Sequence, residues 1–321
     1  MATRAESPPA QTLPVDAPHV AVAWACGLAS VVVYGLTPTV AALSYDTGLT
    51  PTVLVALRSL CGAILILAFA GATGRIRRVP VRAALGLMLV CGPLFGLQVI
   101  CYFAAVQSTG AQVSVVVVHV YPVFVLFFVW LTTRQRQNPA VIVLCLVMIG
   151  GIGLVGGSGG AAVTPAGVGL AVTSAVGYAL YLVLGERWVR HVGAVLSSGL
   201  VTVGAAATAG LVAAGLVAAV TAQPASFTAA GWVSVIAQGA FMIPIGVGCA
   251  FYAVRRLGSV SLSLLGLLEP VVGVLAARVV LGERLQPVQW AGMLVILAVC
   301  AILPRVSAAR KVPVGTDVAA D

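Results

Sequence analysis

The segment SLLGLLEPVVGVLAARVVLGERL, residues 263–285, is apolar enough to cross a bilayer, yet Glu269 and Pro270 stand near its middle. A charge at the centre of the hydrocarbon costs about 3 kcal/mol. Proline lacks a backbone donor and disfavours helical geometry in the residue before it. Both features are tolerated where protein or a water-filled cavity satisfies the polar groups. The segment therefore predicts a broken membrane helix with Glu269 facing the interior of a helix bundle.

The whole chain shares this apolar character. Of its 321 residues, 61% are hydrophobic and 8% are charged, whereas soluble domains carry about 25% charged residues. Polar, glycine-containing or proline-containing breaks divide it into ten blocks, each near the length that a membrane helix needs. The blocks are residues 20–44, 52–72, 83–106, 111–132, 139–157, 166–186, 195–221, 229–254, 259–281 and 288–304. We therefore predict an all-α integral membrane protein with ten transmembrane helices.

The basic residues indicate how the chain is oriented. With ten spans, 14 of the 17 Lys and Arg residues fall on one face, and the positive-inside rule makes that face cytoplasmic, together with both termini. We predict a multi-pass protein of the cell (cytoplasmic) membrane, with the lipid bilayer as its surroundings. This distribution explains the net charge of +9 without a nucleic-acid partner. The 14 are Arg4, Arg75, Arg77, Arg78, Arg82, Arg134, Arg136, Arg187, Arg190, Arg255, Arg256, Arg305, Arg310 and Lys311.

An internal repeat is visible at a shift of 148 residues. It aligns CYFAAVQSTG…YPVF (101–124) with CAFYAVRRLG…EPVV (249–272), so that Pro122 meets Pro270. A unit of five spans is odd, so the second copy enters the membrane inverted. Inverted repeats and broken helices near the midplane are typical of secondary transporters. The predicted organisation is a disordered cytoplasmic tail (1–19), two five-helix repeats (20–157 and 166–304) and a cytoplasmic tail (305–321).

Several motifs together resemble the EamA family of the drug/metabolite transporter superfamily. They are LLEPVVGVLAARVVLGERL, the W-A-G at 290–292, Arg58 in LVALRSLCGA and the triplet Tyr121-Pro122-Val123. One departure is Gln135, where a glutamate often follows the fourth span of family members. The resemblance implies two inverted five-helix repeats around a central cavity, and an exporter of small metabolites such as amino acids that works by alternating access.

Two intramembrane charges are the principal candidates for function. Burial in a low-dielectric medium penalises a charged carboxylate, so Glu269 could bind and release a proton during transport. Alternatively, it joins two helices through hydrogen bonds. Arg58 could bind a substrate carboxylate with its planar guanidinium. Alternatively, it snorkels toward a helix end or forms an ion pair with Glu269.

Further candidates are polar or aromatic residues within the predicted spans. His119 is either an interhelical hydrogen-bond partner or a site residue. Tyr121 occupies the repeat position of Glu269 and should turn toward the same cavity, and Pro122 and Pro270 are expected to break their helices. The remaining cavity candidates, for which aromatic packing is the alternative, are Tyr34, Tyr102, Tyr178 and Tyr181.

Other functions find little support in the sequence. GIGLVG at 151–156 matches a dinucleotide-binding pattern, but it ends an apolar span rather than following a strand. The seven cysteines form no metal-binding pattern. We expect no cofactor and no metal. A membrane-embedded enzyme acting on a lipid or small molecule is the alternative, yet no H-E-x-x-H, G-x-S-x-G or paired intramembrane aspartates occur. A transporter of a small-molecule substrate, and not an enzyme, is therefore favoured.

The predicted topology can be tested by cysteine labelling in a cysteine-free background. A cysteine replacing Gly160 should react with a membrane-impermeant reagent added outside intact cells. Cysteines replacing Arg77 and Gln135 should react only from the cytoplasmic side, because the positive-inside rule places these connections there. Labelling of residue 77 from outside would show that the topology is wrong.

Overall fold

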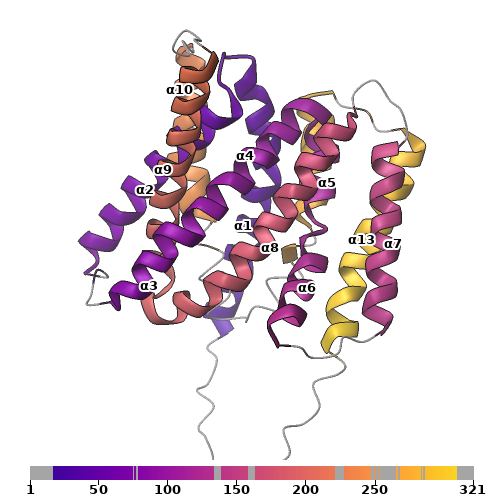
Figure 1. Ribbon diagram of the computed structural model, residues 1–321, viewed down its shortest axis with the longest axis horizontal. Helices are drawn as coiled ribbons and strands as arrows, with labels where there is room; N and C mark the ends of the chain where they lie inside the picture. The colour runs from indigo at the N-terminus through magenta and orange to yellow at the C-terminus, as the bar shows by residue number, and fades with distance from the viewer. Residues whose placement is uncertain are drawn as a thin grey trace, which may run out of the picture.

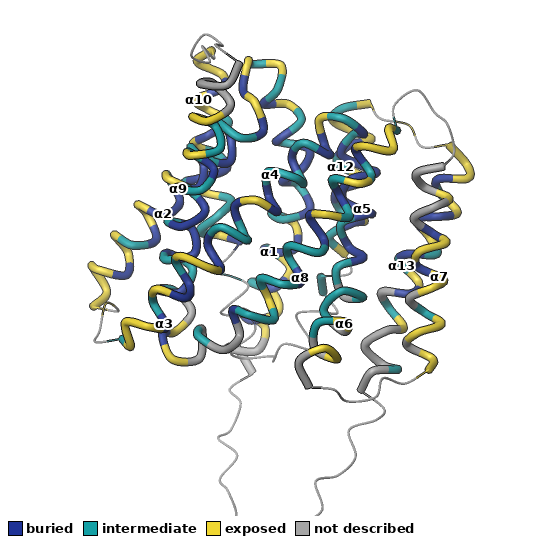
Figure 2. Tube along the Cα trace, in the orientation of Figure 1, coloured by how far each residue is buried: buried dark blue, intermediate teal, exposed yellow. Residues whose placement is uncertain are grey.

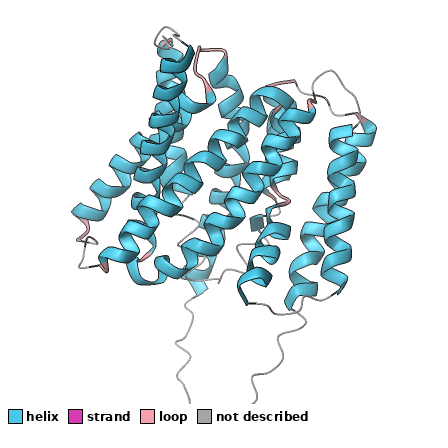
Figure 3. Ribbon diagram, viewed as in Figure 1, coloured by secondary structure: helices cyan, strands magenta, loops and turns pink. Residues whose placement is uncertain are grey.

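The computed structural model describes residues 17–74, 76, 79–133, 139–157, 163–220, 228–246, 249, 253, 265–266, 268–282, 284 and 286–308. All regular secondary structure within these residues is helical (Figures 1 and 3). Residues 1–16 of the predicted tail 1–19, residues 309–321 of the predicted tail 305–321 and the connection 134–138 lie outside the described residues. The first helix begins at Ala17, inside the predicted tail 1–19, and the last continues to Ala308 rather than ending at residue 304.

The helices of the first half of the chain include one π-helix. They are α1 (Ala17–Tyr45), α2 (Pro51–Ala72), α3 (Val81–Gly86), the π-helix η1 (Leu87–Cys91), α4 (Gly92–Thr109), α5 (Ala111–Val118), α6 (Tyr121–Thr133) and α7 (Pro139–Gly157). The second half contains α8 (Pro165–Val192), α9 (Ala194–Val220), α10 (Ala229–Ile236), the π-helix η2 (Ala237–Met242), α12 (Glu269–Val280) and α13 (Pro287–Ala308).

The helix boundaries repeat along the chain. Helices α1, α3, α6 and α7 begin at residues 17, 81, 121 and 139, and α8, α10, α12 and α13 begin at residues 165, 229, 269 and 287, each 148 residues later. Helices α2 and α9 end at residues 72 and 220, again 148 apart. The shift seen in residues 101–124 therefore extends over nearly the whole chain, and the molecule is built from two repeats.

Within the described residues, six helices are long and apolar enough to cross a membrane. They cover residues 21–45, 51–72, 81–109, 165–185, 195–215 and 229–246, which are the first three predicted spans of each repeat. The other four predicted spans fall on α5–α6, α7, α12 and α13, where the continuous apolar helix is shorter in the described residues. Six spans are thus observed as helices of membrane length, and the total of ten remains a prediction.

Figure 2 shows exposed residues along the outer helices of the bundle. Many of the exposed residues are large and hydrophobic. On α7 the side chains of Ile142, Val143, Leu146 and Ile149 are all more than half exposed. Contiguous apolar surface of this kind is unfavourable in water, and the hydrocarbon of a bilayer removes the penalty. The composition and this surface together identify a multi-pass integral membrane protein.

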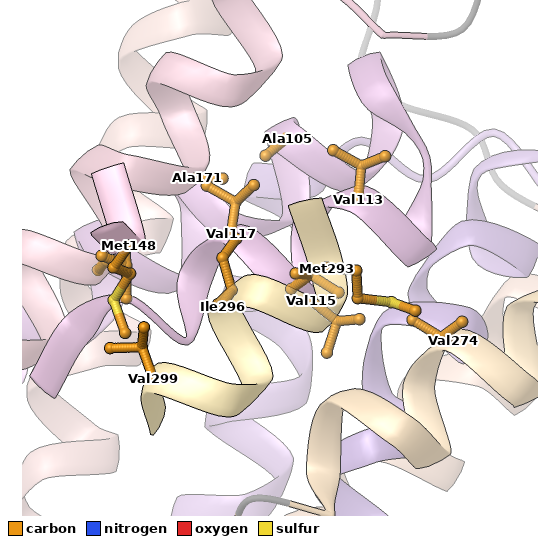
Figure 4. Packing of buried hydrophobic residues seen from close by; sticks show 13 residues of the cluster. Ala105, Val113, Val115, Val117, Met148, Ala171, Val274, Met293, Ile296 and Val299 are labelled. Carbon is orange, nitrogen blue, oxygen red and sulfur yellow. The ribbon is translucent and has the colours of Figure 1, made fainter. Parts of the chain in front are cut away.

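The largest apolar cluster joins the two repeats (Figure 4). Val113, Val115 and Val117 of α5 belong to it, as do Met148 of α7 and Ala171 of α8. The second repeat also contributes Val274 from α12 and three residues of α13, namely Met293, Ile296 and Val299. Because α5 packs on helices of the other repeat, the position of its C-terminal end is set by both halves of the chain.

Helix α12 is held between α1 and α5 by close backbone contacts. A Cβ atom on Gly35 of α1 would lie 2.7 Å from Cβ of Val272 and 2.9 Å from the Glu269 carbonyl oxygen. A Cβ atom on Gly273 of α12 would lie 3.0 Å from Val115 of α5 and 3.1 Å from the Gly35 carbonyl oxygen. Small residues allow membrane helices to approach this closely. These contacts fix the start of α12, and with it Glu269.

Connections that the topology places on one face also meet in the structure. The Thr228 amide donates to the Thr47 carbonyl over 3.1 Å, joining the start of α10 to the α1–α2 connection. The Thr164 hydroxyl, before α8, donates to the Ser108 carbonyl near the end of α4 over 3.4 Å. All four residues belong to connections that the basic-residue pattern assigns to the outer face.

A second close contact joins η1 to α9 and provides a test of the packing. A Cβ atom on Gly204 would overlap the Met88 carbonyl oxygen and lie 2.9 Å from the Cα atom of Gly92. We expect Gly204→Ala to lower the free energy of unfolding by about 1–3 kcal/mol, because overpacking forces the helices apart.

The measurement is thermal unfolding of the purified protein in detergent. The matched control is Gly210→Ala in the same helix, where an added Cβ meets no atom within 4 Å. Alanine is intrinsically better than glycine in a helix by about 1 kcal/mol, so the control should be neutral or stabilised. Equal stability of the two variants would contradict the packing described here.

Candidate functional site

Two helix breaks lie at equivalent positions of the repeats. The first is at His119 and Val120, whose amides donate to the carbonyls of Val116 and Val117 over 3.2 Å each, three residues back rather than four. The second precedes α12, where the Leu268 amide donates to the Leu265 carbonyl over 2.9 Å. In both repeats a new helix begins at the next residue, Tyr121 or Glu269, and its second residue is a proline.

The prolines therefore stand just inside the first turn of α6 and α12, where a missing backbone donor is tolerated. The prediction that Pro122 and Pro270 break their helices agrees with this placement, and the irregular residues lie immediately before them. Pro270 is buried. The residues ahead of each proline carry the polar side chains of the site.

His119 and Glu269 meet across the two breaks. The His119 Nε2 atom lies 3.4 Å from Oε2 of Glu269, with side chains 11% and 26% exposed respectively. The other ring nitrogen, Nδ1, lies 2.6 Å from the Val115 carbonyl oxygen. His119 ends α5 in the first repeat and Glu269 begins α12 in the second, so this contact links the repeats.

Arg58 is buried in α2, with 6% of its surface exposed. Its Nη1 atom donates to Oε1 of Gln238 over 3.2 Å, and its guanidinium carbon lies 4.5 Å from the centre of the Phe103 ring, in a cation–π contact. The Gln238 amide continues the network by donating to the Ser44 hydroxyl over 3.3 Å. The alternatives of a snorkelling Arg58 and of an Arg58–Glu269 ion pair are both wrong, since the guanidinium is buried and Glu269 pairs with His119.

The Nε atom of Arg58 is buried and has no hydrogen-bond partner within the described part of the chain. A buried charged group left partly unsatisfied is costly, so the guanidinium retains capacity for a further acceptor. Phe103 and Gln238 hold its plane and orientation. Tyr45 helps to hold Phe103 in place, because the Tyr45 hydroxyl donates to the Phe103 carbonyl over 2.8 Å.

Several tyrosines lie near Arg58 or near the His119–Glu269 contact. Tyr34 of α1 and Tyr102 of α4 each interact electrostatically with both Arg58 and Glu269. On the other side, the Tyr121 ring lies 6.1 Å from His119 and 4.9 Å from Tyr178, edge to face.

Tyr178 in turn stacks on Tyr181 with ring centres 5.9 Å apart. The Tyr181 ring also contacts Phe95 of α4 at 5.3 Å. All five tyrosines are intermediate in exposure, so they are neither fully packed nor on an open surface.

The structure thus gathers every side chain proposed from the sequence into one connected region. We call it the polar–aromatic cluster, and it consists of Tyr34, Arg58, Tyr102, His119, Tyr121, Tyr178, Tyr181 and Glu269. Its members come from both repeats.

Sequence reasoning missed the residues that hold this cluster. Gln238 and Gln112 are buried amides within apolar helices, and Gln112 donates to the Val274 carbonyl of α12 over 3.1 Å. Gln98 accepts a hydrogen bond from Ser174 over 3.0 Å, joining α4 to α8. The available signal was a lone glutamine in an apolar span, which marks a buried interhelical hydrogen bond.

A separate hollow of about 330 Å³ lies beside α6 and is lined only by apolar residues. None of its lining residues belongs to the polar–aromatic cluster, and Phe127, one of them, is about half exposed. Its lining suits a hydrocarbon chain rather than a polar metabolite. Among the described residues, no three His, Cys, Asp or Glu side chains gather in a group that could hold a metal ion.

Comparison with known proteins identifies the family. The model of the EamA-like transporter family matches residues 21–157 and again residues 165–304. The chain belongs to the EamA-like transporter family. The two matched segments follow the two structural repeats, so this EamA protein carries one family unit in each half.

Structural comparison supports the fold of this EamA protein. A solved chain described only as "Crystal structure of protein" superposes with a TM-score of 0.59 at 20% identity, covering 89% of the present chain and 98% of the other. At that identity the likeness concerns the fold alone. No curated protein matches the sequence. The EamA assignment suggests a membrane transporter.

Proposed function

We propose that this EamA protein is a secondary transporter that exports small metabolites carrying a carboxylate, such as amino acids, across the cytoplasmic membrane by alternating access. The observation that carries the proposal is the polar–aromatic cluster, in which the Arg58 guanidinium and the Glu269 carboxylate both lie within electrostatic range of the same two tyrosines, Tyr34 and Tyr102. It lies where broken helices of two repeats meet, the position at which secondary transporters bind substrate.

Arg58 is the proposed contact for the substrate carboxylate. The guanidinium is already oriented by Gln238 and by the Phe103 ring, so little side-chain entropy is lost when a ligand binds. The described residues place no carboxylate against it, and a bidentate pair with a substrate carboxylate would satisfy its charge. Tyrosine hydroxyls nearby could bind the polar remainder of the substrate.

Glu269 is the proposed coupling residue, with the proton as the coupling ion. It is partly buried, it stands at the junction of the repeats, and it contacts a histidine, which can exchange protons near neutral pH. The opposite orientation of the repeats would let the same cluster face either side in turn. Export, as opposed to import, follows from the family resemblance, and no feature of the described residues favours the alternative of a membrane-embedded enzyme.

The function is tested first by finding the substrate. Untargeted metabolomics of the medium should show compounds that rise on overexpression and fall on deletion, and these should carry a carboxylate. Purified protein in proteoliposomes should then accumulate such a compound, chemically unchanged, when a pH gradient is imposed. Chemical conversion of the compound would indicate an enzyme and contradict the proposal.

Glu269→Gln should abolish accumulation driven by the pH gradient, because an amide cannot release a proton. Substrate exchange without a gradient should survive, since the amide preserves the size and much of the hydrogen bonding of the carboxylic acid. Both rates are measured in proteoliposomes at matched protein levels. A glutamine variant with the pH dependence of the wild type would leave Glu269 with a structural role.

Arg58→Lys should raise KM for the substrate at least about tenfold, because lysine keeps the charge but loses the bidentate geometry and its preset orientation. Initial exchange rates over a range of substrate concentrations give KM. Arg278→Lys is the matched control, since Arg278 is exposed at the end of α12, and its KM should not change. Unaltered exchange by Arg58→Ala would exclude Arg58 from substrate binding.

A further inference from the structure

The contact between His119 and Glu269 restricts where protons can sit. The Val115 carbonyl can only accept a hydrogen bond, so the Nδ1 atom 2.6 Å away must carry a hydrogen. In a neutral imidazole with hydrogen on Nδ1, the Nε2 atom is a bare acceptor. It is this Nε2 atom that faces Oε2 of Glu269 at 3.4 Å.

A bare imidazole nitrogen and an ionised carboxylate repel each other, because both present lone pairs. The contact becomes attractive when a single proton lies on either side of it. The proton then sits on Nε2, giving an imidazolium beside a carboxylate, or on Glu269, giving a carboxylic acid that donates to a neutral imidazole. Both forms carry one proton and no net charge, and its release leaves the pair with a charge of −1.

We propose that His119 and Glu269 together form one proton-binding site, which is the coupling-ion site of this transporter. The inference rests on the transport function proposed above and assigns the coupling proton to two residues rather than to Glu269 alone. In this proposal the arrangement in which the two side chains are in contact is the one that holds the proton. Val115 fixes the tautomer through its carbonyl and so directs Nε2 at the carboxylate.

The backbone supports the same assignment. His119 caps the C-terminal end of the eight-residue helix α5, and Glu269 lies in the first turn of the twelve-residue helix α12. A helix C-terminus stabilises a positive charge and an N-terminus stabilises a negative one. Each side chain thus stands at the helix end that suits its charged form, and both ends are anchored by the contacts of Val115 with Gly273 and Gln112 with Val274.

The pair is surrounded by tyrosines and one arginine. In the described part of the chain its neighbours are Tyr34 on α1, Tyr102 on α4, Tyr121 on α6 and Tyr178 on α8, with Arg58 beyond the first two. Tyrosine ordinarily titrates at about pH 10 and arginine at about pH 12 or above. These neighbours therefore keep their charge across a physiological pH gradient, and the proposed proton is assigned to the pair.

Loss of the proton has a structural consequence. It turns the attraction between Nε2 and Oε2 into repulsion at the junction of the α5–α6 break and the start of α12. The two breaks belong to different repeats, so the proton ties the repeats together and its release frees them to separate. This links the state of the site to the movement that alternating access requires.

The first test measures the protonation of the His119 ring nitrogens and needs no substrate. The chain has three histidines, so His19→Asn with His191→Asn leaves His119 as the only one. Nitrogen-15 NMR of this histidine-labelled protein in lipid should show hydrogen on Nδ1 in the neutral form of the ring. Adding Glu269→Gln should move the midpoint of its titration by about one pH unit or more. A neutral ring with hydrogen on Nε2, or an unmoved midpoint, would overturn the shared site.

The second test uses pH-driven accumulation in proteoliposomes. In His119→Gln the side-chain amide presents to Glu269 a donor that cannot release its proton. Accumulation should therefore be lost, so that the substrate concentrations inside and outside the proteoliposomes become equal, while substrate exchange persists. The double variant His119→Gln, Glu269→Gln should lose no more pH-driven accumulation than either single variant, because the two substitutions remove the same proton-binding site. His119→Asn, which keeps a donor at the position of Nδ1, should show the same loss and serves if the glutamine variant does not fold.

His191→Gln is the matched control, since His191 is exposed at the end of α8, and it should accumulate substrate as the wild type does. Accumulation at the wild-type level by both His119 variants would overturn the proposal. Failure of the wild type to transport would instead reject the proposed function, and the NMR result would still decide whether the pair shares one proton. The two failures are therefore distinguishable.

Discussion

The structure depends on the close approach of α12 to α1 and α5. Gly35 and Gly273 remove the side chains that would keep these helices apart, and their backbones meet where Val115 and Val272 fill the space around them. In a bilayer there is no hydrophobic force between helices, so van der Waals contact of this kind must hold them. The same contact brings the start of α12 against the end of α5, which places Glu269 beside His119.

Every charge and amide inside the bundle needs a partner, because hydrocarbon offers none. Arg58 obtains its partners from Gln238 and Phe103, and Gln98 obtains one from Ser174. These bonds all cross between helices, so each polar group also specifies which helices are neighbours. The polar residues therefore determine the arrangement of the bundle, while the small residues determine how tightly it packs.

The two repeats share a backbone plan but differ in chemistry. Helices α6 and α12 begin 148 residues apart, each with proline as its second residue. Yet the first residue is Tyr121 in one copy and Glu269 in the other, and the position of His119 is taken by leucine in the second copy. The two repeats thus contain similar helix breaks, but the residue after the break is aromatic in the first repeat and acidic in the second. Asymmetry of this kind allows a single proton to lie between the copies.

The sequence by itself determined the membrane character, the repeat and the candidate residues. An 8% charged content requires hydrocarbon, and the register of 148 was readable from Pro122 and Pro270, because helix breaks depend on local backbone chemistry. The tertiary structure decided which side chains the buried charged residues contact. Glu269 and Arg58 carry opposite charges, and the sequence left an ion pair between them open as one alternative. Only the packing of α12 against α5 shows that Glu269 meets His119, and only the burial of Gln238 beside α2 shows what holds Arg58. Partners of this kind lie 150 or 180 positions apart in the chain, and such contacts follow from how helices are arranged in space rather than from any local pattern.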